Sequence, residues 1–170
     1  MSSDKCYSNE KVGVLFVCMG NICRSPTAEG VFTALAQALG MSHLLSIDSA
    51  GTHDYHVGNP PDERARQAAL KRGIEIGHLR ARQVTRADLV ANDYILAMDG
   101  HNLNVLRRLG AHGLEHKIRL FLEFAPHTEF QEVPDPYFGG GEGFEVVLDL
   151  IEAASKGLLN EIRGRVTLGR

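Results

Sequence analysis

Apolar residues along this chain recur in two ways, as short unbroken runs and as stretches in which they return every three or four positions. The run over 12–17 is apolar almost throughout, which is typical of a strand that is buried on both faces. Comparable runs predict three further strands, one from residue 44 through 47 that ends in residues 49–51, and two over residues 94–98 and 117–121. The stretches of helical period predict helices over residues 25–39, 62–72, 102–109 and 144–162.

This alternation of strand and helix predicts a single α/β domain. Strands that alternate with helices form a parallel sheet, so we expect a four-stranded parallel sheet, doubly wound with helices on both faces. A chain of 170 residues is long enough for one hydrophobic core and short for two. The polar residues 1–11 predict a disordered N-terminal segment, and residues 12–170 form the predicted domain. Ligands bind such sheets at the carboxyl ends of the strands, where Cys18 lies.

Composition and charge narrow the classes of partner. The net charge of -3 argues against binding to nucleic acid and against attraction to an anionic membrane. The apolar runs are far shorter than the roughly 20 residues that cross a bilayer, and no secretory signal is visible in the polar N-terminus. We therefore expect a cytoplasmic protein without nucleic-acid or membrane partners. An odd count of 3 cysteines without an export signal favours reduced thiols over a disulfide framework.

The candidate chemistry concentrates where the first strand ends and the first helix begins. Cys18 and Arg24 stand six positions apart in the stretch CMGNICRS. A loop this tight can turn successive backbone N–H groups inward, and with the following helix N-terminus it forms a nest for a phosphate dianion. Gly20 and Asn21 suit strained positions because both reach positive φ more readily than most residues. The predicted phosphate-binding loop comprises Met19, Gly20, Asn21, Ile22, Cys23 and Ser25.

Cys18 and Arg24 have complementary roles in such a loop. The donors that bind phosphate also stabilise a thiolate, so Cys18 is the predicted nucleophile. Arg24 offers a planar fork of donors that can hold two phosphoryl oxygens during the transfer. One alternative is a structural buried cysteine, which is the commoner fate of an intracellular cysteine. A second is half of a zinc site formed with Cys23, but the sequence has no second cysteine pair to complete it.

Cleavage of a phosphate ester also needs a proton for the leaving oxygen. Asp135 lies between Pro134 and Pro136, which keep the backbone out of a helix and let the side chain project towards a neighbouring pocket. We therefore predict that Asp135 is the proton donor. The alternative is an ordinary turn aspartate, and without the cysteine loop that interpretation would prevail.

Together these motifs resemble the low-molecular-weight protein tyrosine phosphatase family. The resemblance rests on residues 18–26 with Asp135, Pro136 and Tyr137, and it extends to residues 49–52, His78, Arg82, Met98 and Asp99. It implies a doubly wound fold and a two-step hydrolysis that needs no metal or other cofactor. In the reaction so implied, Cys18 takes the phosphoryl group while Asp135 protonates the leaving phenol, and Asp135 then activates water against the phosphocysteine.

The resemblance also implies supporting residues and a substrate pocket. The residues implied to hold the loop in shape are Asn21, Ser49, His78 and Asp99, while Ser25 helps to stabilise the thiolate. The implied pocket residues are Met19, Tyr55 and Tyr137, although plain packing is an equal alternative for either tyrosine. Apolar and aromatic walls suit the flat ring of phosphotyrosine. The expected partners are therefore phosphotyrosine proteins or peptides, with inorganic phosphate as product.

Several residues separate this chain from related functions. Relatives that resemble protein arginine phosphatases tend to carry threonine where this chain has Met19. Phe138 stands where some members of the family have a second tyrosine, which leaves Tyr137 as the phosphorylation candidate. Arsenate reductases of similar fold need further resolving cysteines, and no cysteine follows Cys23. The rival from another class is a module that captures phosphotyrosine without turnover. The proximity of Cys18 to Cys23 suggests a reversible, protective disulfide.

Overall fold

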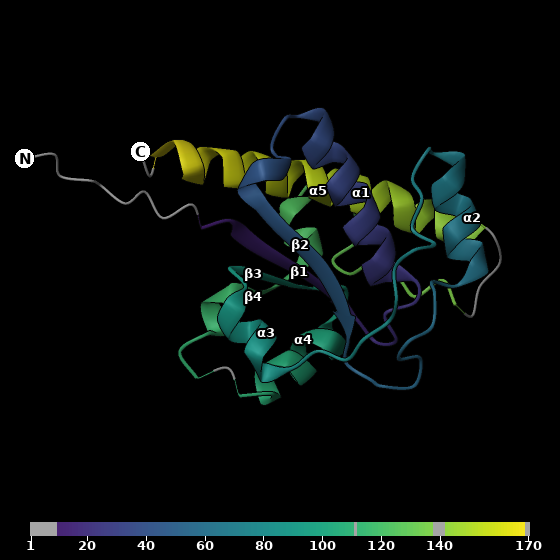
Figure 1. Ribbon diagram of the computed structural model, residues 1–170, viewed down its shortest axis with the longest axis horizontal. Coiled ribbons are helices and arrows are strands. Elements are labelled where there is room, and N and C mark those ends of the chain that lie inside the picture. The colour runs from purple at the N-terminus through teal and green to yellow at the C-terminus, as the bar shows by residue number, and fades with distance from the viewer. Residues whose placement is uncertain (1–9, 111, 138–141, 169–170) are drawn as a thin grey trace, which may run out of the picture.

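The sheet has four parallel strands, with β1 (Val12–Cys18) in its interior (Figure 1). The computed structural model describes residues 10–110, 112–137 and 142–168. The strand order is β2, β1, β3, β4, and each neighbouring pair is parallel. The other strands are β2 (Leu45–Gly51), β3 (Tyr94–Ala97) and β4 (Ile118–Leu120). The predicted four-stranded α/β fold is confirmed, while the predicted N-terminal disorder falls largely on residues 1–9, outside the described residues.

Helices cover both faces of this sheet, as the alternation of elements predicts. One face carries α1 (Arg24–Ala38) and α5 (Glu142–Leu168) (Figure 1). The opposite face carries α3 (Arg86–Ala91) and α4 (Gly100–Arg108). α2 (Glu63–Lys71) packs beside α1 and α5. The 3-10 turns are η1 (Ser42–Leu44), η2 (Glu115–Lys117) and η3 (Phe121–Phe124). No helix within the described ranges combines the length and the apolar character needed to cross a bilayer.

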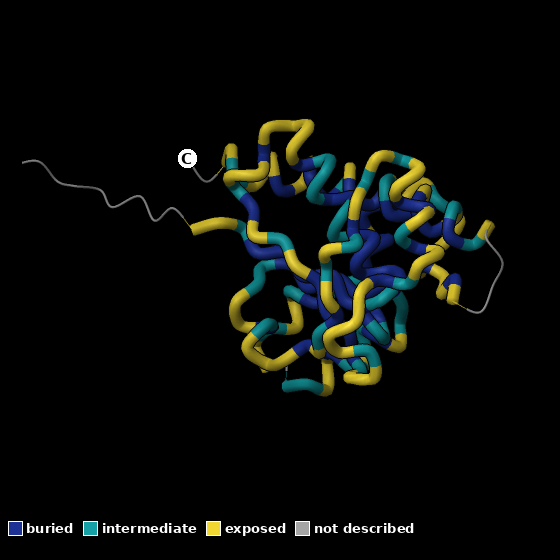
Figure 2. The backbone as a smooth tube through the Cα atoms, turned by 45° about the vertical axis from the view of Figure 1, so that its right-hand side comes forward, coloured by how far each residue is buried: buried dark blue, intermediate teal, exposed yellow. Residues whose placement is uncertain are grey.

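The two faces of β1 separate two apolar cores. Val14 and Phe16 pack on the side of α1 and α5, where the Phe16 ring meets two other phenylalanine rings edge to face at 5.4 and 5.0 Å. Leu15 and Val17 pack on the side of α3 and α4. All four side chains are fully buried, and in Figure 2, where buried residues are dark blue, β1 is buried beyond its first residue. Because both faces are covered, β1 holds the residue at its carboxyl end in a fixed position.

The structure departs from the prediction at α3 and at β4 for local reasons. The six-residue helix α3 escaped prediction because it is too short to display a helical period, although Thr85 and Asp88 form a capping box at its start. The predicted strand over 117–121 is too long, because Phe121 begins a 3-10 turn. Both differences lie away from the cysteine loop.

The pairing of β1 with β2 brings two carboxyl ends side by side. Cys18 pairs with Gly51, the last residue of β2, and the strand predicted from residue 44 ends at Gly51 as expected. A Cβ atom on Gly51 would lie 2.7 Å from the Met19 carbonyl oxygen, so only glycine allows so close an approach. The loop that follows β1 therefore rests directly against the end of β2.

Candidate active site

Cys18 is the last residue of β1, and its sulfur faces donors from the loop that follows. The residue is 3% exposed. Its Sγ accepts a hydrogen bond from the Asn21 N–H at 3.3 Å and lies 3.0 Å from Ser25 Oγ. Asn21 has a positive φ of 55°, which no other non-glycine residue in the described part of the chain adopts. Gly20 does not take positive φ, but a Cβ atom there would lie 2.9 Å from His56 Cδ2, so a larger residue would displace the His56 ring.

The loop and the first turn of α1 border a cavity of about 220 Å³. α1 begins at Arg24, and no side chain caps its N-terminus. Within the described ranges, the N–H groups of Ile22, Cys23 and Arg24 have no protein acceptor, and all three residues line the cavity. Unpaired N–H groups at a helix N-terminus favour an anion. The cavity is therefore built to receive a group such as phosphate.

Arg24 brings a positive charge to this cavity. Nη1 donates to Asp99 Oδ2 at 2.7 Å and to the Val133 carbonyl oxygen at 2.9 Å. Burial opposes the charge of the guanidinium, but its neighbours Cys18 and Asp99 outweigh burial and raise the pKa of Arg24 above its ordinary value. Arg24 is therefore charged and held in one orientation, as a clamp for phosphoryl oxygens must be.

Asp135 reaches the same cavity from the segment between η3 and α5. Its Oδ1 accepts a hydrogen bond from the Tyr137 N–H at 3.0 Å, which fixes the turn that follows. Its Oδ2 lies 3.6 Å from Arg24 Nη2, and its side chain is 31% exposed. The carboxyl group is thus within reach of both the cavity and solvent.

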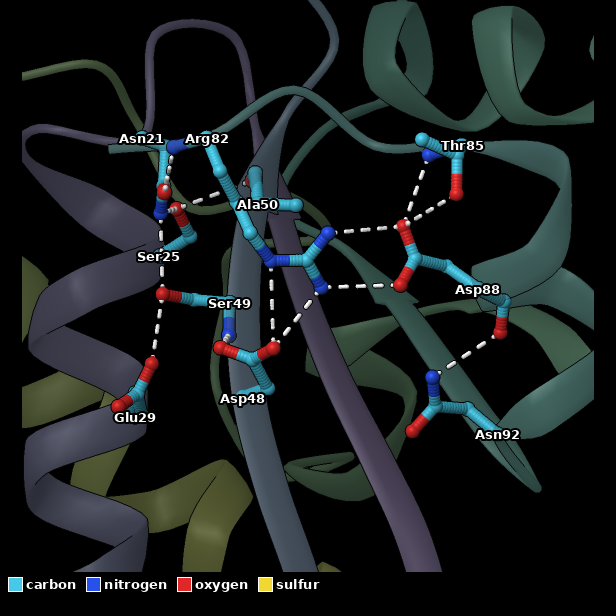
Figure 3. Close-up of polar contacts among 10 residues, drawn as sticks. All are labelled: Asn21, Ser25, Glu29, Asp48, Ser49, Ala50, Arg82, Thr85, Asp88 and Asn92. Carbon is cyan, nitrogen blue, oxygen red and sulfur yellow. Dashed lines mark hydrogen bonds and ion pairs between the residues drawn. The ribbon is translucent and has the colours of Figure 1, made fainter. Parts of the chain in front are cut away.

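A chain of hydrogen bonds behind the loop holds Asn21 in place (Figure 3). Asn21 Nδ2 donates to Ser25 Oγ at 2.8 Å and to Ser49 Oγ at 3.0 Å. Ser49 Oγ in turn donates to Glu29 Oε1 at 2.8 Å. Burial raises the pKa of Glu29 to about 7. Through Ser25, this chain connects the Cys18 sulfur with a carboxyl group on the next turn of α1.

Arg82 also holds Asn21, and through it the cysteine loop, in place. Its backbone N–H donates to Asn21 Oδ1 at 3.1 Å. Its guanidinium lies between two carboxylates, 2.9 Å from Asp48 and 2.9 Å from Asp88 (Figure 3). Because Asp48 belongs to β2 and Asp88 to α3, Arg82 ties the cysteine loop to both elements.

Most of the predicted site residues converge, but two lie elsewhere. The residues that line the cavity are Cys18, Met19, Gly20, Ile22, Cys23, Arg24, His56, Asp135 and Tyr137. Tyr55 is not among them, since it is 79% exposed and packs near His53. His78 lies with Glu29 at a separate surface hollow. No hydrogen bond among the described residues joins His78 to Asn21 or Ser49.

Two residues at this site were not predicted from the sequence. Glu29 lies on α1. The sequence pattern that could have singled it out is a carboxylate among the buried apolar positions Ala28, Val31 and Phe32. His56 follows Tyr55 in the loop after β2, and no pattern in the sequence distinguishes it. Both reach the site only through the packing of separate elements.

Cys23 is the second cysteine of the loop, and its thiol is buried. Burial, and then the charges of Asp62 and Cys18, raise the pKa of Cys23 to about 12. Cys23 is therefore a protonated thiol near neutral pH.

The described residues contain no group of three or more His, Cys, Asp or Glu side chains placed to hold a metal ion.

Comparisons with known proteins point to one family. The family model for the low molecular weight phosphotyrosine protein phosphatases matches residues 13–167. The chain belongs to this family. The rat low molecular weight phosphotyrosine protein phosphatase is 46% identical over 136 residues, which cover 79% of this chain and 85% of the rat protein. The low molecular weight protein-tyrosine-phosphatase YfkJ of Bacillus subtilis is 40% identical over 152 residues, which cover 89% of this chain and 96% of YfkJ.

Solved structures of such phosphatases share the fold. A protein tyrosine phosphatase from Entamoeba histolytica, crystallised with Hepes in its active site, matches with a TM-score of 0.88 at 37% identity, covering 91% of this chain and 98% of that one. The crystal structure of YfkJ matches with a TM-score of 0.87 at 38% identity, covering 92% and 97%. As a low-molecular-weight phosphatase, the chain is a hydrolase that acts on phosphoric monoesters.

Proposed function

We propose that this phosphatase hydrolyses phosphotyrosine through a phosphocysteine formed on Cys18. The observation that supports this most is the convergence of Cys18, Arg24 and Asp135 on one cavity, from β1, α1 and the segment before α5. A nucleophile, an anion clamp and a carboxyl group are the parts that phosphoryl transfer needs besides backbone donors.

In the first step, the unpaired N–H groups of the loop and the Arg24 guanidinium bind the phosphoryl oxygens. The Cys18 thiolate attacks phosphorus opposite the ester oxygen, so the S–P bond forms as the P–O bond to the phenol breaks. Asp135, protonated at this stage, gives its proton to the departing oxygen. Ser25 Oγ, 3.0 Å from Sγ, donates a hydrogen bond that stabilises the thiolate before attack.

In the second step, the same groups work in reverse order. Asp135 is now a carboxylate, and its exposed side chain receives a water molecule from solvent. It takes a proton from this water as the oxygen attacks phosphorus, and the S–P bond breaks. Inorganic phosphate leaves and Cys18 returns as the thiolate.

The lining of the cavity supports an aromatic ester as substrate. Met19, Ile22 and Tyr137 offer apolar surface above the phosphate loop, and the ring of phosphotyrosine is long enough to cover it. A phosphoserine side chain is too short to do so. The free thiols Cys18 and Cys23 fit a reducing, cytoplasmic setting, and we expect phosphotyrosine proteins as substrates, with no nucleic-acid or membrane partner.

Steady-state hydrolysis of peptides that carry phosphotyrosine, phosphoserine or phosphoarginine tests this proposal. We expect turnover of phosphotyrosine in particular, no turnover with Cys18→Ser, and a kcat lowered about a hundredfold or more with Asp135→Asn. Asp149→Asn, a matched change on the exposed side of α5 that leaves Arg72 paired with Glu145, should leave the rates unchanged. Tight binding of phosphotyrosine without turnover, or an active Cys18→Ser variant, would overturn the mechanism.

A further inference from the structure

The segment that carries Asp135 has a firm anchor on its N-terminal side. The Val133 N–H donates to the Met98 carbonyl oxygen at 2.8 Å, and Val133 is fully buried. Its carbonyl oxygen also accepts from Arg24. On the C-terminal side, the Tyr137 N–H donates to the Asp135 carboxylate at 3.0 Å. Whatever holds Tyr137 therefore also orients the acid.

Arg64, in the first turn of α2, holds Tyr137. Its Nη2 donates to the Tyr137 carbonyl oxygen at 3.1 Å. Its guanidinium carbon lies 5.4 Å from the centre of the Tyr137 ring and 5.1 Å from that of Phe144, at the start of α5. Both distances are within the range of cation–π contacts. The Arg64 side chain thus contacts the backbone and the ring of Tyr137 in the acid segment, residues 133–137, and also contacts α5.

Arg64 is itself fixed by Asp62. Asp62 caps α2 by accepting from the Arg64 N–H at 2.9 Å, and its two carboxylate oxygens accept from Nε and Nη2 at 3.1 Å each. The Asp62 N–H donates to the Ile22 carbonyl oxygen in the phosphate loop at 2.8 Å. The pair of Asp62 and Arg64 therefore links the phosphate loop to residue 137, in addition to the contacts that Arg24 makes with Val133 and Asp135.

The far end of α2 is held as well. Arg72 Nη2 donates to Glu145 Oε2 at 2.7 Å and to Asp149 Oδ1 at 2.9 Å on α5. Figure 1 shows α2 beside the first turns of α5. The helix therefore cannot shift easily along α5, so the position of Arg64 is set by the fold.

We infer that Arg64 is a positioning residue for the general acid, acting through Tyr137 to keep the Asp135 carboxyl group at the leaving oxygen. This inference rests on the proposed function. Arg64 does not line the cavity and does not touch the reacting atoms. An ordinary surface arginine would pair with Asp62 alone, whereas this guanidinium also engages Tyr137 and Phe144.

Leaving-group dependence separates a positioning role from a structural one. A general acid matters more as the leaving phenol becomes more basic, so poor placement of Asp135 penalises phenyl phosphate more than 4-nitrophenyl phosphate. For Arg64→Ala we expect kcat/KM to fall about tenfold with phenyl phosphate and only about twofold with 4-nitrophenyl phosphate. Arg64→Lys keeps one donor for the Tyr137 carbonyl and should lie between wild type and alanine.

The matched control is Arg66→Ala. Arg66 lies on the same helix with a similarly exposed side chain, but it pairs with Glu63 and Glu75. Its variant should change kcat/KM by less than about twofold for both substrates. If Arg64→Ala does not fold, Arg64→Met keeps the apolar stem without the donors and gives the same test.

A double-mutant cycle completes the experiment. Once Asp135→Asn has removed the acid, Arg64→Ala should add less than about a twofold loss. Equal losses of kcat/KM with phenyl phosphate and 4-nitrophenyl phosphate in Arg64→Ala would overturn the inference. So would an Arg64→Ala loss of kcat/KM in the Asp135→Asn background that is as large as in wild type. If instead wild type does not hydrolyse aryl phosphates, or Cys18→Ser does, the proposed function itself fails, so the two failures are distinguishable.

Discussion

Asp99 performs two tasks, and substitutions can separate them. Its Oδ2 accepts from Arg24 Nη1 at 2.7 Å, and its Oδ1 accepts from the Asn102 N–H at 2.8 Å as the N-cap of α4. Asp99→Asn keeps a capping oxygen but removes the charge that faces Arg24. Asp99→Ala removes both interactions. The difference between the two variants therefore isolates the cap, and the first variant isolates the ion pair.

The structure sets the size of each effect. Removing one partner of a fully buried ion pair costs about 3–5 kcal/mol. The Arg24 side chain is 4% exposed but that of Asp99 is 22% exposed, and Val133 and Asp135 still face the guanidinium. We therefore expect Asp99→Asn to lower the free energy of unfolding by about 2 kcal/mol. Loss of the cap adds about 1 kcal/mol, which gives about 3 kcal/mol for Asp99→Ala.

Urea unfolding and steady-state kinetics with 4-nitrophenyl phosphate measure both consequences. Because Arg24 loses its fixed orientation in either variant, kcat/KM should fall about tenfold or more in both, by similar factors. Asp149→Asn, whose side chain is 71% exposed, should stay within about 0.5 kcal/mol of wild type. An Asp99→Asn variant with wild-type stability and with kcat/KM within about twofold of wild type would show that the Asp99 charge does not hold Arg24 in place.

Three further predictions concern the surroundings of the loop. Burial raises the pKa of Glu29 from its ordinary value of 4.5 to about 7, so the free energy of unfolding should fall as the pH rises from about 4.5 to 7. Glu29→Gln should abolish this pH dependence in urea unfolding. An unchanged pH dependence in the variant would contradict the burial argument. Gly51→Ala places a Cβ 2.7 Å from a carbonyl oxygen of the loop and should cost about 1–3 kcal/mol in thermal unfolding. Gly164→Ala, with open space, should cost nothing. Because burial raises the pKa of Cys23 to about 12, mild peroxide should give a Cys18–Cys23 disulfide in a yield that rises with pH. Mass spectra that show only a sulfinic acid on Cys18 at every pH would count against the protection of Cys18 by this disulfide.

The part of the site that could be predicted from sequence is contiguous. The strand, the loop and the helix start follow one another within residues 12–26, so spacing and residue type define Cys18 and Arg24 together. Short-range backbone geometry sufficed there, including the positive φ of Asn21. Asp135 needed the resemblance, because nothing local shows which pocket a turn aspartate faces.

The rest of the site depends on contacts between distant segments. Glu29 and Arg64 resemble ordinary charged helix residues, and only the packing of α1 on β2 and of α2 on the acid segment shows their partners. Tyr55 and His56 are neighbours in one loop, yet His56 lines the cavity and Tyr55 faces solvent. The direction of a loop side chain follows from backbone geometry that hydrophobic periodicity does not encode.

The most direct test of the account is to trap the phosphoenzyme. An aryl phosphate is mixed with excess wild-type protein, quenched in acid before turnover is complete, and the digested protein is analysed by mass spectrometry. The mechanism predicts a phosphate adduct on the peptide that contains Cys18, which is absent with Cys18→Ser and accumulates in Asp135→Asn, where hydrolysis of the intermediate lacks its base. Turnover of the aryl phosphate without any adduct on Cys18, or with the adduct on another residue, would contradict it.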